Sequence, residues 1–476
     1  MHRVDSQKRK KLILRIVSYS VLVLLTVATS AVLLYVALGY RVDRDGEVIR
    51  SGLLLVDARP VAADIYINGQ NKNDPTASKF VLPAGRYGIT LKRQGYRDWS
   101  RTVNISASGV ENLYYPQLIP QKLSYKKQLI LSEPQALLQS PDKKLVFYYA
   151  NNAVNPQVIT LDEKQSVVQN LALPASFVRQ SGGLGSFRAL EWSLDNRHVL
   201  VEQKVGADKR ILSIDTKNGL NSIDVTAAFG GRSFTDPHYA GKKADRLYGL
   251  NAGVLYQLDL SQKKATALLG QVKSYQTFSD DTLSFARYNT KQRRMEAGLW
   301  RDGVTTIVHS VAAAPSQGGI TRYVSFDTVD YFVVQLANEK TVTVYQNPLS
   351  EPILAQQIPL IAIRFQNSLP FTVSANGQFV LMQHGRSVAV YDLDRRSVAR
   401  FVLAKNESTP LWLDSHRFTT ILDGVTYVSD FDNTNRFSLA KSEYGSVLFS
   451  NDYRSTYRFD KAENSTQLGA SSMVAQ

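Results

Sequence analysis

Cysteine is absent from all 476 residues. This excludes disulfides, thiolate metal sites and cysteine nucleophiles. Histidine is scarce, and no two histidines have the i, i+4 spacing of a zinc-binding helix. We therefore predict no catalytic residue, no metal ligand and no cofactor from these residue types. The six histidines stand singly at His2, His198, His238, His309, His384 and His416.

Charge is absent from residues 16–39, the apolar run IVSYSVLVLLTVATSAVLLYVALG. A helix of this length spans roughly 36 Å, which is enough to cross a hydrocarbon core of about 30 Å. We predict a transmembrane helix over residues 16–40. A cleaved signal peptide ending at Ala37-Leu38-Gly39 is the alternative, but its apolar region is usually only about 7 to 15 residues. The expected anchor residues are Ile16, Val23, Leu24, Leu25, Leu33, Leu34 and Tyr35.

Basic residues precede this run, and a single acid, Asp5, accompanies them. Lysine and arginine accumulate on the cytoplasmic side of membrane helices. We therefore expect residues 1–15 to form a basic cytoplasmic tail, and the chain after the helix to lie outside the cell as a single-pass membrane protein bound to the lipid bilayer. The residues that set this topology are Lys8, Arg9, Lys10, Lys11 and Arg15, together with Arg3.

The remaining composition is that of folded domains, with 44% hydrophobic and 20% charged residues. The chain is too long for one ordinary core, so two or more domains are expected after the anchor. The net charge of +15 favours contact with anionic wall polymers, lipid head groups or nucleic acid. A solvated surface that serves solubility explains the same charge.

Strand signals begin after a short polar stalk at residues 41–50. The runs SGLLLVD and ADIYIN are apolar or alternating, and the second ends at Asn68-Gly69, a hairpin signal. No helical pattern appears between residues 51 and 107. We predict a small β-sandwich over residues 51–107, with Tyr66, Tyr87, Tyr96 and Trp99 in its core.

The order LLVDARP, ADIYINGQ and FVLPAGRYGITLKRQGYRDW resembles the PEGA domain, a surface-exposed bacterial and archaeal β-module. The sequence departs from the family pattern where Asn73 or Asp74 replaces a glycine and where Pro75 and Thr76 are inverted. The resemblance implies a structural or adhesive module without catalytic residues. Its motif falls on Pro60, Tyr66, Gly69, Pro83, Gly85, Tyr87, Gly95 and Tyr96.

A repeat fills residues 132–476, after a linker at 108–131. Each copy has a polar turn, a buried strand, a second strand and an acidic hairpin, which together make a four-stranded blade. The clearest turns are Ser140-Pro141-Asp142-Lys143 and Ser374-Ala375-Asn376-Gly377. The region resembles TolB-like and WD40-like propellers of seven blades, or of eight if residues 445–472 form one. A strand within residues 122–131 would then close the ring, and the fold class is mainly β.

Acidic residues dominate the repeated turns and allow two interpretations. Paired carboxylates perform acid and base chemistry in glycosidases, whereas aspartates at equivalent turns usually bind their own backbone. We favour the structural interpretation. The aspartates concerned are Asp142, Asp162, Asp195, Asp215, Asp259, Asp280, Asp392, Asp394 and Asp414.

Three weaker motifs have better structural explanations. Gly182-Gly183-Leu184-Gly185 lacks the Lys-Ser or Lys-Thr of a phosphate loop. Residues 430–433 lack the spaced ligands and terminal glutamate of a calcium loop. Tyr96-Arg97 and the Tyr453–Arg458 stretch pair aromatic and basic residues, as single-strand binding surfaces do. Strand tyrosines are common in β-folds, so nucleic acid is an unlikely partner.

Function is the least determined property. The first hypothesis is a non-catalytic binding or scaffold protein, anchored in the membrane, that contacts a cell-envelope polymer or a protein partner. The alternative is an extracytoplasmic propeller hydrolase or lyase acting on envelope carbohydrate or peptide, which requires ionisable groups that converge on the propeller axis. A signal transducer is a third class, but a tail of about fifteen residues leaves room only for a partner helix.

Overall fold

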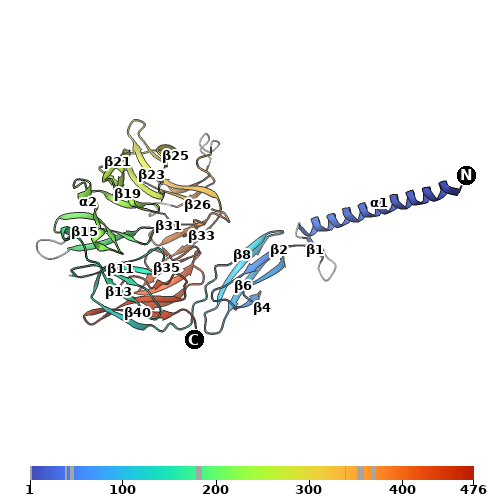
Figure 1. Cartoon of the computed structure of the whole chain (residues 1–476), viewed down its shortest axis with the longest axis horizontal. Helices are drawn as coiled ribbons and strands as arrows, with labels where there is room; N and C mark the ends of the chain where they lie inside the picture. Colours follow the sequence, from blue (N-terminus) through green and yellow to red (C-terminus); the bar gives the residue numbers. More distant parts are fainter. Residues whose placement is uncertain are drawn as a thin grey trace. The chain divides into compact units, whose positions relative to one another are not determined.

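One long helix is followed almost entirely by β-strands (Figure 1). This computed structural model describes residues 3–37, 40–42, 48–151, 153–177, 185–337, 339–350, 359–365 and 371–475. The chain divides into two compact units, Met1–Lys122 with Ala475–Gln476, and Leu123–Val474. The fold class is mainly β, as predicted.

Helix α1 spans Arg3–Ala37. Its apolar part, Leu12–Val36, has 25 residues and a mean hydropathy of 2.2, and none of it is buried inside the protein. A helix of this length and composition can cross a membrane, as an anchor or as a signal sequence. The predicted anchor side chains are all exposed: Ile16, Val23, Leu24, Leu25, Leu33, Leu34 and Tyr35.

The helix differs in its bounds from the segment predicted over 16–40. It begins at Arg3, so the predicted basic tail with Lys8, Arg9, Lys10, Lys11 and Arg15 is helical. Lysine and arginine have high helix propensity, and an existing helix extends through them at little cost. It ends at Ala37, and Leu38-Gly39 lie outside the described residues.

The predicted stalk is replaced by strand pairing. Strand β1 (Tyr40–Val42) is antiparallel to the start of β2 (Val48–Val56). The Tyr40 ring stacks on Tyr35 at the end of α1, with 4.6 Å between centroids. Residues 43–47 lie outside the described part of the chain.

Two four-stranded sheets then form a β-sandwich. In the first sheet β2 pairs with β1, with β5 and, in parallel, with β8. The second has the order β4-β3-β6-β7. Because β8 belongs to the first sheet, the predicted linker begins with a strand of the sandwich. The bounds are β3 Asp64–Ile67, β4 Gln70–Pro75, β5 Ser78–Pro83, β6 Gly85–Lys92, β7 Trp99–Ile105 and β8 Val110–Leu113.

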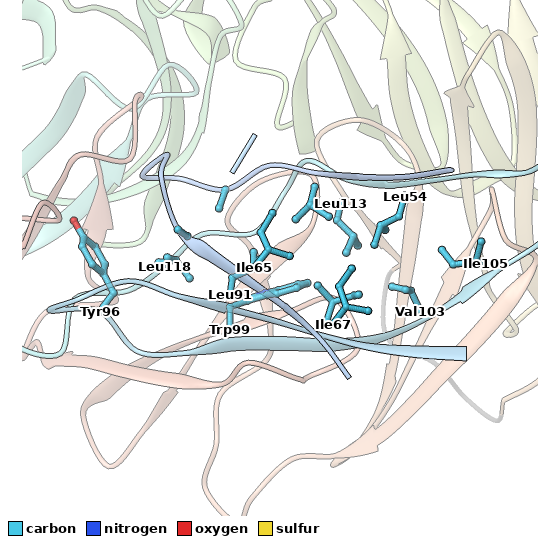
Figure 2. Packing of buried hydrophobic residues seen from close by; sticks show 14 residues of the cluster. Leu54, Ile65, Ile67, Leu91, Tyr96, Trp99, Val103, Ile105, Leu113 and Leu118 are labelled. Atoms are coloured by element: carbon cyan, nitrogen blue, oxygen red, sulfur yellow. The ribbon is translucent and has the colours of Figure 1, made fainter. Parts of the chain in front are cut away.

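The sandwich core comes from alternate residues of both sheets. Figure 2 shows Leu54, Ile65, Leu91 and Trp99 packed together. Period-two alternation of the strands sends these side chains to the inner faces. Trp99 is 1% exposed and is the largest side chain of this cluster.

The predicted motif residues lie mainly at turns. Gly69, with φ +80°, forms the β3–β4 hairpin, and Gly95, with φ +82°, lies between β6 and β7. These left-handed angles favour glycine. The other motif residues lie at the β2–β3 connection (Pro60), in β3 (Tyr66), at the end of β5 (Pro83), in β6 (Gly85 and Tyr87) and beside Gly95 (Tyr96).

Of the four aromatics expected in the core, Tyr66 was assigned wrongly. Tyr96 and Trp99 are buried, and Tyr87 is partly buried against the same cluster. Tyr66 stands between Ile65 and Ile67, which both point inward, so the alternation of β3 sends its ring to the outer face. There the Lys92 ammonium lies 5.2 Å from the ring centroid.

Within the described residues, eight four-stranded sheets form the blades of the propeller. Blades 1 to 4 are β10–β13 (Pro134–Gln139, Leu145–Ala150, Gln157–Thr160, Val167–Asn170), β14–β17 (Ser186–Trp192, His198–Val205, Asp208–Asp215, Ile223–Asp224), β18–β21 (Thr235–Ala240, Lys243–Asn251, Val254–Asp259, Lys264–Leu269) and β22–β25 (Val272–Ser279, Thr282–Asn289, Arg294–Arg301, Val304–Ala312).

Blades 5 to 7 follow the same order along the chain. They are β26–β29 (Gly319–Phe326, Val329–Leu336, Thr341–Gln346, Ile361–Arg364), β30–β33 (Thr372–Val373, Phe379–His384, Ser387–Asp392, Ser397–Val402) and β34–β37 (Leu411–Trp412, Arg417–Leu422, Val425–Asp430, Phe437–Lys441). Three helical turns interrupt blade 2 and its approach: η1 Ala175–Phe177, η2 Gly219–Asn221 and α2 Val225–Ala228.

Blade 8 is completed from the other end of the propeller region. It contains β38 (Leu448–Phe449), β39 (Ser455–Ala462), β40 (Ser465–Ser472) and, as outermost strand, β9 (Lys126–Leu131). Tyr148 of blade 1 packs in one cluster with Phe459 of blade 8. In the described part of the chain the ring therefore has eight blades, and it is closed by the strand expected within residues 122–131.

Candidate functional site

Contacts between neighbouring blades indicate that the first strand of a blade lies on its inner side. First strands of neighbouring blades contact one another at β10 and β14, at β18 and β22, and at β22 and β26. We call these eight first strands the inner strands. Their side chains are the ones that can reach neighbouring blades near the axis.

Three ionisable side chains meet on the inner strands β14 and β18. His238 Nδ1 lies 2.8 Å from Glu191 Oε2, and His238 Nε2 lies 3.2 Å from Asp236 Oδ1. The Tyr275 hydroxyl, from β22, donates to the Asp236 carbonyl. We call Glu191, Asp236, His238 and Tyr275 the histidine cluster. The His238 side chain is 29% exposed, so solvent reaches it only partly.

The charge state of the cluster follows from its contacts. Burial alone lowers the pKa of His238, but hydrogen bonds and charge attraction from Asp236 and Glu191 outweigh it and raise the pKa to about 9. The ring is therefore an imidazolium at neutral pH, with each N–H directed at a different carboxylate. Such a ring has no free lone pair with which to accept a proton or bind a metal. In the described part of the chain, no group of three or more His, Cys, Asp or Glu residues is arranged to hold a metal ion.

A second polar contact crosses inner strands β22, β26 and the start of β30. Arg322 on β26 donates through Nη1 to Gln276 Oε1 and through Nη2 to the Phe371 carbonyl, at 3.0 Å. Burial lowers the pKa of the Arg322 guanidinium. This arginine joins three consecutive blades through neutral acceptors.

A third cluster lies where the ring closes. The Lys143 ammonium, in the first turn of blade 1, donates to the Leu413 carbonyl of blade 7 at 2.7 Å and to the Tyr453 hydroxyl of blade 8. Burial lowers the pKa of Lys143 to about 8, with Asp414 opposing and Arg417 adding to the shift. The Tyr453 ring has Lys143 Nζ at 4.1 Å and the Arg417 guanidinium at 5.1 Å. Two cations therefore contact the ring of Tyr453, one of the tyrosines considered for single-strand binding.

Seven of the nine turn aspartates have the structural role that we favoured. Asp142 Oδ1 accepts from Ser140 Oγ at 2.6 Å and from the Lys144 N–H at 3.1 Å. Asp280 differs, because it accepts from the Lys242 N–H of the neighbouring blade, and Asp394 gives its own N–H to Asp392. The other predicted aspartates accept backbone N–H groups of their own turns: Asp162, Asp195, Asp215, Asp259, Asp392 and Asp414.

One of the two further motifs is only partly described, and the other is described in full. Residues 182–184 of the glycine run lie outside the described residues, and Gly185 leads into β14. In the stretch 430–433, Asp430 Oδ2 accepts from the Asn435 amide at 2.8 Å, and Asp432 accepts from Thr434. These carboxylates bind their own turn.

The histidine cluster and Arg322 were not predicted from the sequence. Glu191 and His238 lie 47 positions apart, and each was one polar residue inside a strand. A signal existed: each charged residue lies within an inner strand, where a blade core favours apolar residues. Only the placement of neighbouring blades brings these residues together.

One segment of the chain matches a known protein family. Residues 51–117 match the model of the PEGA domain. This segment is a PEGA domain. The match includes β8 and ends after the predicted sandwich boundary at 107, in agreement with the strand pairing. No curated protein matches the chain.

Solved propellers resemble the chain at low identity. The C-terminal WD40 domain of Sif2 shares 10% identity, with 73% of this chain and 98% of that chain covered and a TM-score of 0.48. The Dos1 propeller shares 12%, covering 74% and 96%, with a TM-score of 0.44. An oligogalacturonate lyase from Vibrio parahaemolyticus shares 9%, covering 74% and 97%, with a TM-score of 0.40. At this identity the likeness concerns the fold alone.

Proposed function

We propose that the protein is a non-catalytic binding or scaffold protein of the cell envelope. Helix α1 anchors it in the membrane with the N-terminus in the cytoplasm. The PEGA domain and the propeller lie outside the cell. There they contact a wall polymer or a protein partner.

The observation that carries this proposal is the apolar stretch Leu12–Val36, which has no buried part and precedes the strands of the PEGA domain and of the propeller. A fully exposed apolar helix of 25 residues is stable in a bilayer and not in water. The basic residues before it favour a cytoplasmic N-terminus. The net charge of +15 favours anionic polymers over cationic ones.

The histidine cluster supports a binding role over catalysis. General acid–base catalysis works best when the pKa lies near the working pH. His238, with a pKa of about 9 and both N–H groups bound, holds its proton at neutral pH. The cluster then acts as a fixed ion bridge between blades 2 and 3.

The direct test combines binding and turnover. The full chain in detergent is mixed with purified wall polymer and, separately, with solubilised envelope proteins, and the retained fraction and any released sugars or peptides are measured. Salt-sensitive retention of polymer or of a defined partner without turnover is the expected result. Release of products, or the absence of binding to both materials, contradicts the proposal.

The second candidate is an extracytoplasmic hydrolase or lyase acting on envelope carbohydrate or peptide. The meeting of Glu191, Asp236 and His238 on inner strands favours it. Such an enzyme would need a neutral His238, so its activity would rise as the pH approaches about 9. An alkaline activity that His238→Gln abolishes would replace the binding proposal with this one.

A further inference from the structure

Three partly buried arginines of the propeller pair with a carboxylate, and Arg322 does not. Arg197 lies 2.6 Å from Asp215, and Arg246 lies 2.7 Å from Asp281. Arg287 likewise pairs with Glu296. Among the residues that the structure describes, Arg322 has no carboxylate partner, and its two hydrogen bonds go to the Gln276 amide and the Phe371 carbonyl.

This arrangement leaves a charge without compensation. Burial is the cause of the lowered pKa of Arg322, and no acid raises it again. The Nε–H is out of solvent and has no hydrogen-bond partner. Buried charges in proteins are normally paired, because removing an ion from water costs several kcal/mol even after relaxation. An unpaired guanidinium of this kind is therefore a candidate for ligand binding.

Further unpaired donors stand on the next two inner strands. Thr372 on β30 has a buried hydroxyl without a partner, and it directly follows Phe371, whose carbonyl binds Arg322. Trp412 on β34 has a buried, unpaired indole N–H, and its ring stacks on Phe379 of blade 6 at 6.1 Å. The Arg322 guanidinium and the Trp412 indole N–H can only donate hydrogen bonds, and the Thr372 hydroxyl can donate as well.

We propose that Arg322, with the Thr372 hydroxyl and the Trp412 indole N–H as neighbouring donors, forms a binding site for an oxyanion near the propeller axis. The ligand group is a carboxylate or a phosphate, which match the fork of a guanidinium. This inference deepens the proposed function, because it implies that the bound envelope polymer has an anionic repeat unit. The identification of the ligand as a polymer rests on the proposed function, whereas the anion site itself does not.

The test uses the full chain in detergent, with thermal melting as the readout. Millimolar phosphate or acetate is added at constant ionic strength, with chloride as the reference anion. The variant is Arg322→Gln, and the matched control is Arg454→Gln, which removes the same charge from a side chain that is 76% exposed. A ligand that binds the folded state raises Tm in proportion to its occupancy.

We expect phosphate or acetate to raise the Tm of the wild type and of Arg454→Gln, and the apparent affinity to fall at least tenfold in Arg322→Gln. Without an anion, Arg322→Gln should melt at the wild-type temperature or above it, because it removes an uncompensated buried charge. An equal anion response in Arg322→Gln, or none in the wild type, overturns the site. A lower Tm of Arg322→Gln without anion assigns the arginine to structure alone and also overturns it.

Two polymers then distinguish the ligand source. Retention of a polyol-phosphate polymer by the wild type, lost in Arg322→Gln, assigns the site to phosphodiesters, and the same result with a polyuronate assigns it to carboxylates. If small anions bind through Arg322 but neither polymer is retained, the anion site stands and the polymer assignment fails. Equal retention by both proteins shows that the polymer binds elsewhere, which leaves the proposed function intact and removes this site from it.

Discussion

The stability of the propeller should depend on pH through His238. Its pKa rises from 6.5 to about 9 on folding, a difference of roughly 2.5 units. At about 1.4 kcal/mol per unit this corresponds to roughly 3 kcal/mol. Because the folded-state pKa is raised, the contribution is complete below about pH 6.5 and is lost as the pH rises through about 9. The groups that face the ring are Glu191, Asp236 and Tyr275.

The assay compares the wild type with His238→Gln by thermal melting at pH 6 and pH 10. The free energy of unfolding of the wild type exceeds that of the variant by a margin that should be about 3 kcal/mol smaller at pH 10 than at pH 6. For the unit Leu123–Val474, an unfolding entropy of about 2.1 cal/mol/K per residue converts this to about 4 °C in Tm. Comparing two proteins at each pH cancels the titration of groups that do not contact His238. A stability difference between the two proteins that stays constant, or that grows towards pH 10, would refute the reasoning.

Three further predictions concern packing and charge. In the PEGA domain, Trp99→Ala should lower the free energy of unfolding by about 3–5 kcal/mol because it empties the core. Tyr66→Ala, on the outer face, should lower it by under about 1 kcal/mol. Equal losses in urea unfolding would contradict the placement of Trp99 inside and Tyr66 outside. In the ring-closing strand, Leu131→Ala, at a side chain 7% exposed, should cost about 2–4 kcal/mol, and its neighbour Ile130→Ala, 62% exposed, should have little effect on propeller melting. Below pH 8, Lys143→Met should be more stable than the wild type, because the wild type buries an ammonium there. Between pH 8 and 10.5 this advantage in free energy of unfolding should fall by about 2 kcal/mol, because the folded-state pKa of about 8 lets the wild type lose the proton as the pH rises. A difference in Tm that does not change with pH would argue against a buried charge.

The repeated turns account for how much of the fold the sequence could predict. Ser140 and Ser374 each bind the N–H five residues ahead, so the same hydrogen bond recurs with the same residue type and marks a blade. Blade 5 lacks this signal, because β26 and β27 join at Asp327-Thr328, a tight hairpin with positive φ at both residues. That blade therefore carries no such mark, and the choice between seven and eight blades depended on whether residues 445–472 form one.

Alternation was informative only when its phase was known. Tyr66 was placed in the core because aromatic residues favour it, yet Ile65 and Ile67 fix the phase of β3 and send the tyrosine outward. The helix bounds were missed for a similar reason, since hydropathy marks where a bilayer can hold the chain and not where helical hydrogen bonds end.

Sites that need several blades were beyond the sequence. Lys143, Leu413 and Tyr453 are up to 310 positions apart, and they meet only because the ring closes. Arg322 likewise became informative only when the surrounding blades showed that no acid reaches it.

Single-cysteine labelling tests the central claim most directly, because the natural chain contains no cysteine. Arg454→Cys places a thiol at an exposed position of the propeller, and Ser6→Cys places one before the apolar stretch. With a membrane-impermeant maleimide on intact cells, the account predicts labelling at position 454 and labelling at position 6 only after permeabilisation. Labelling at position 6 in intact cells, with protection of position 454, would contradict it.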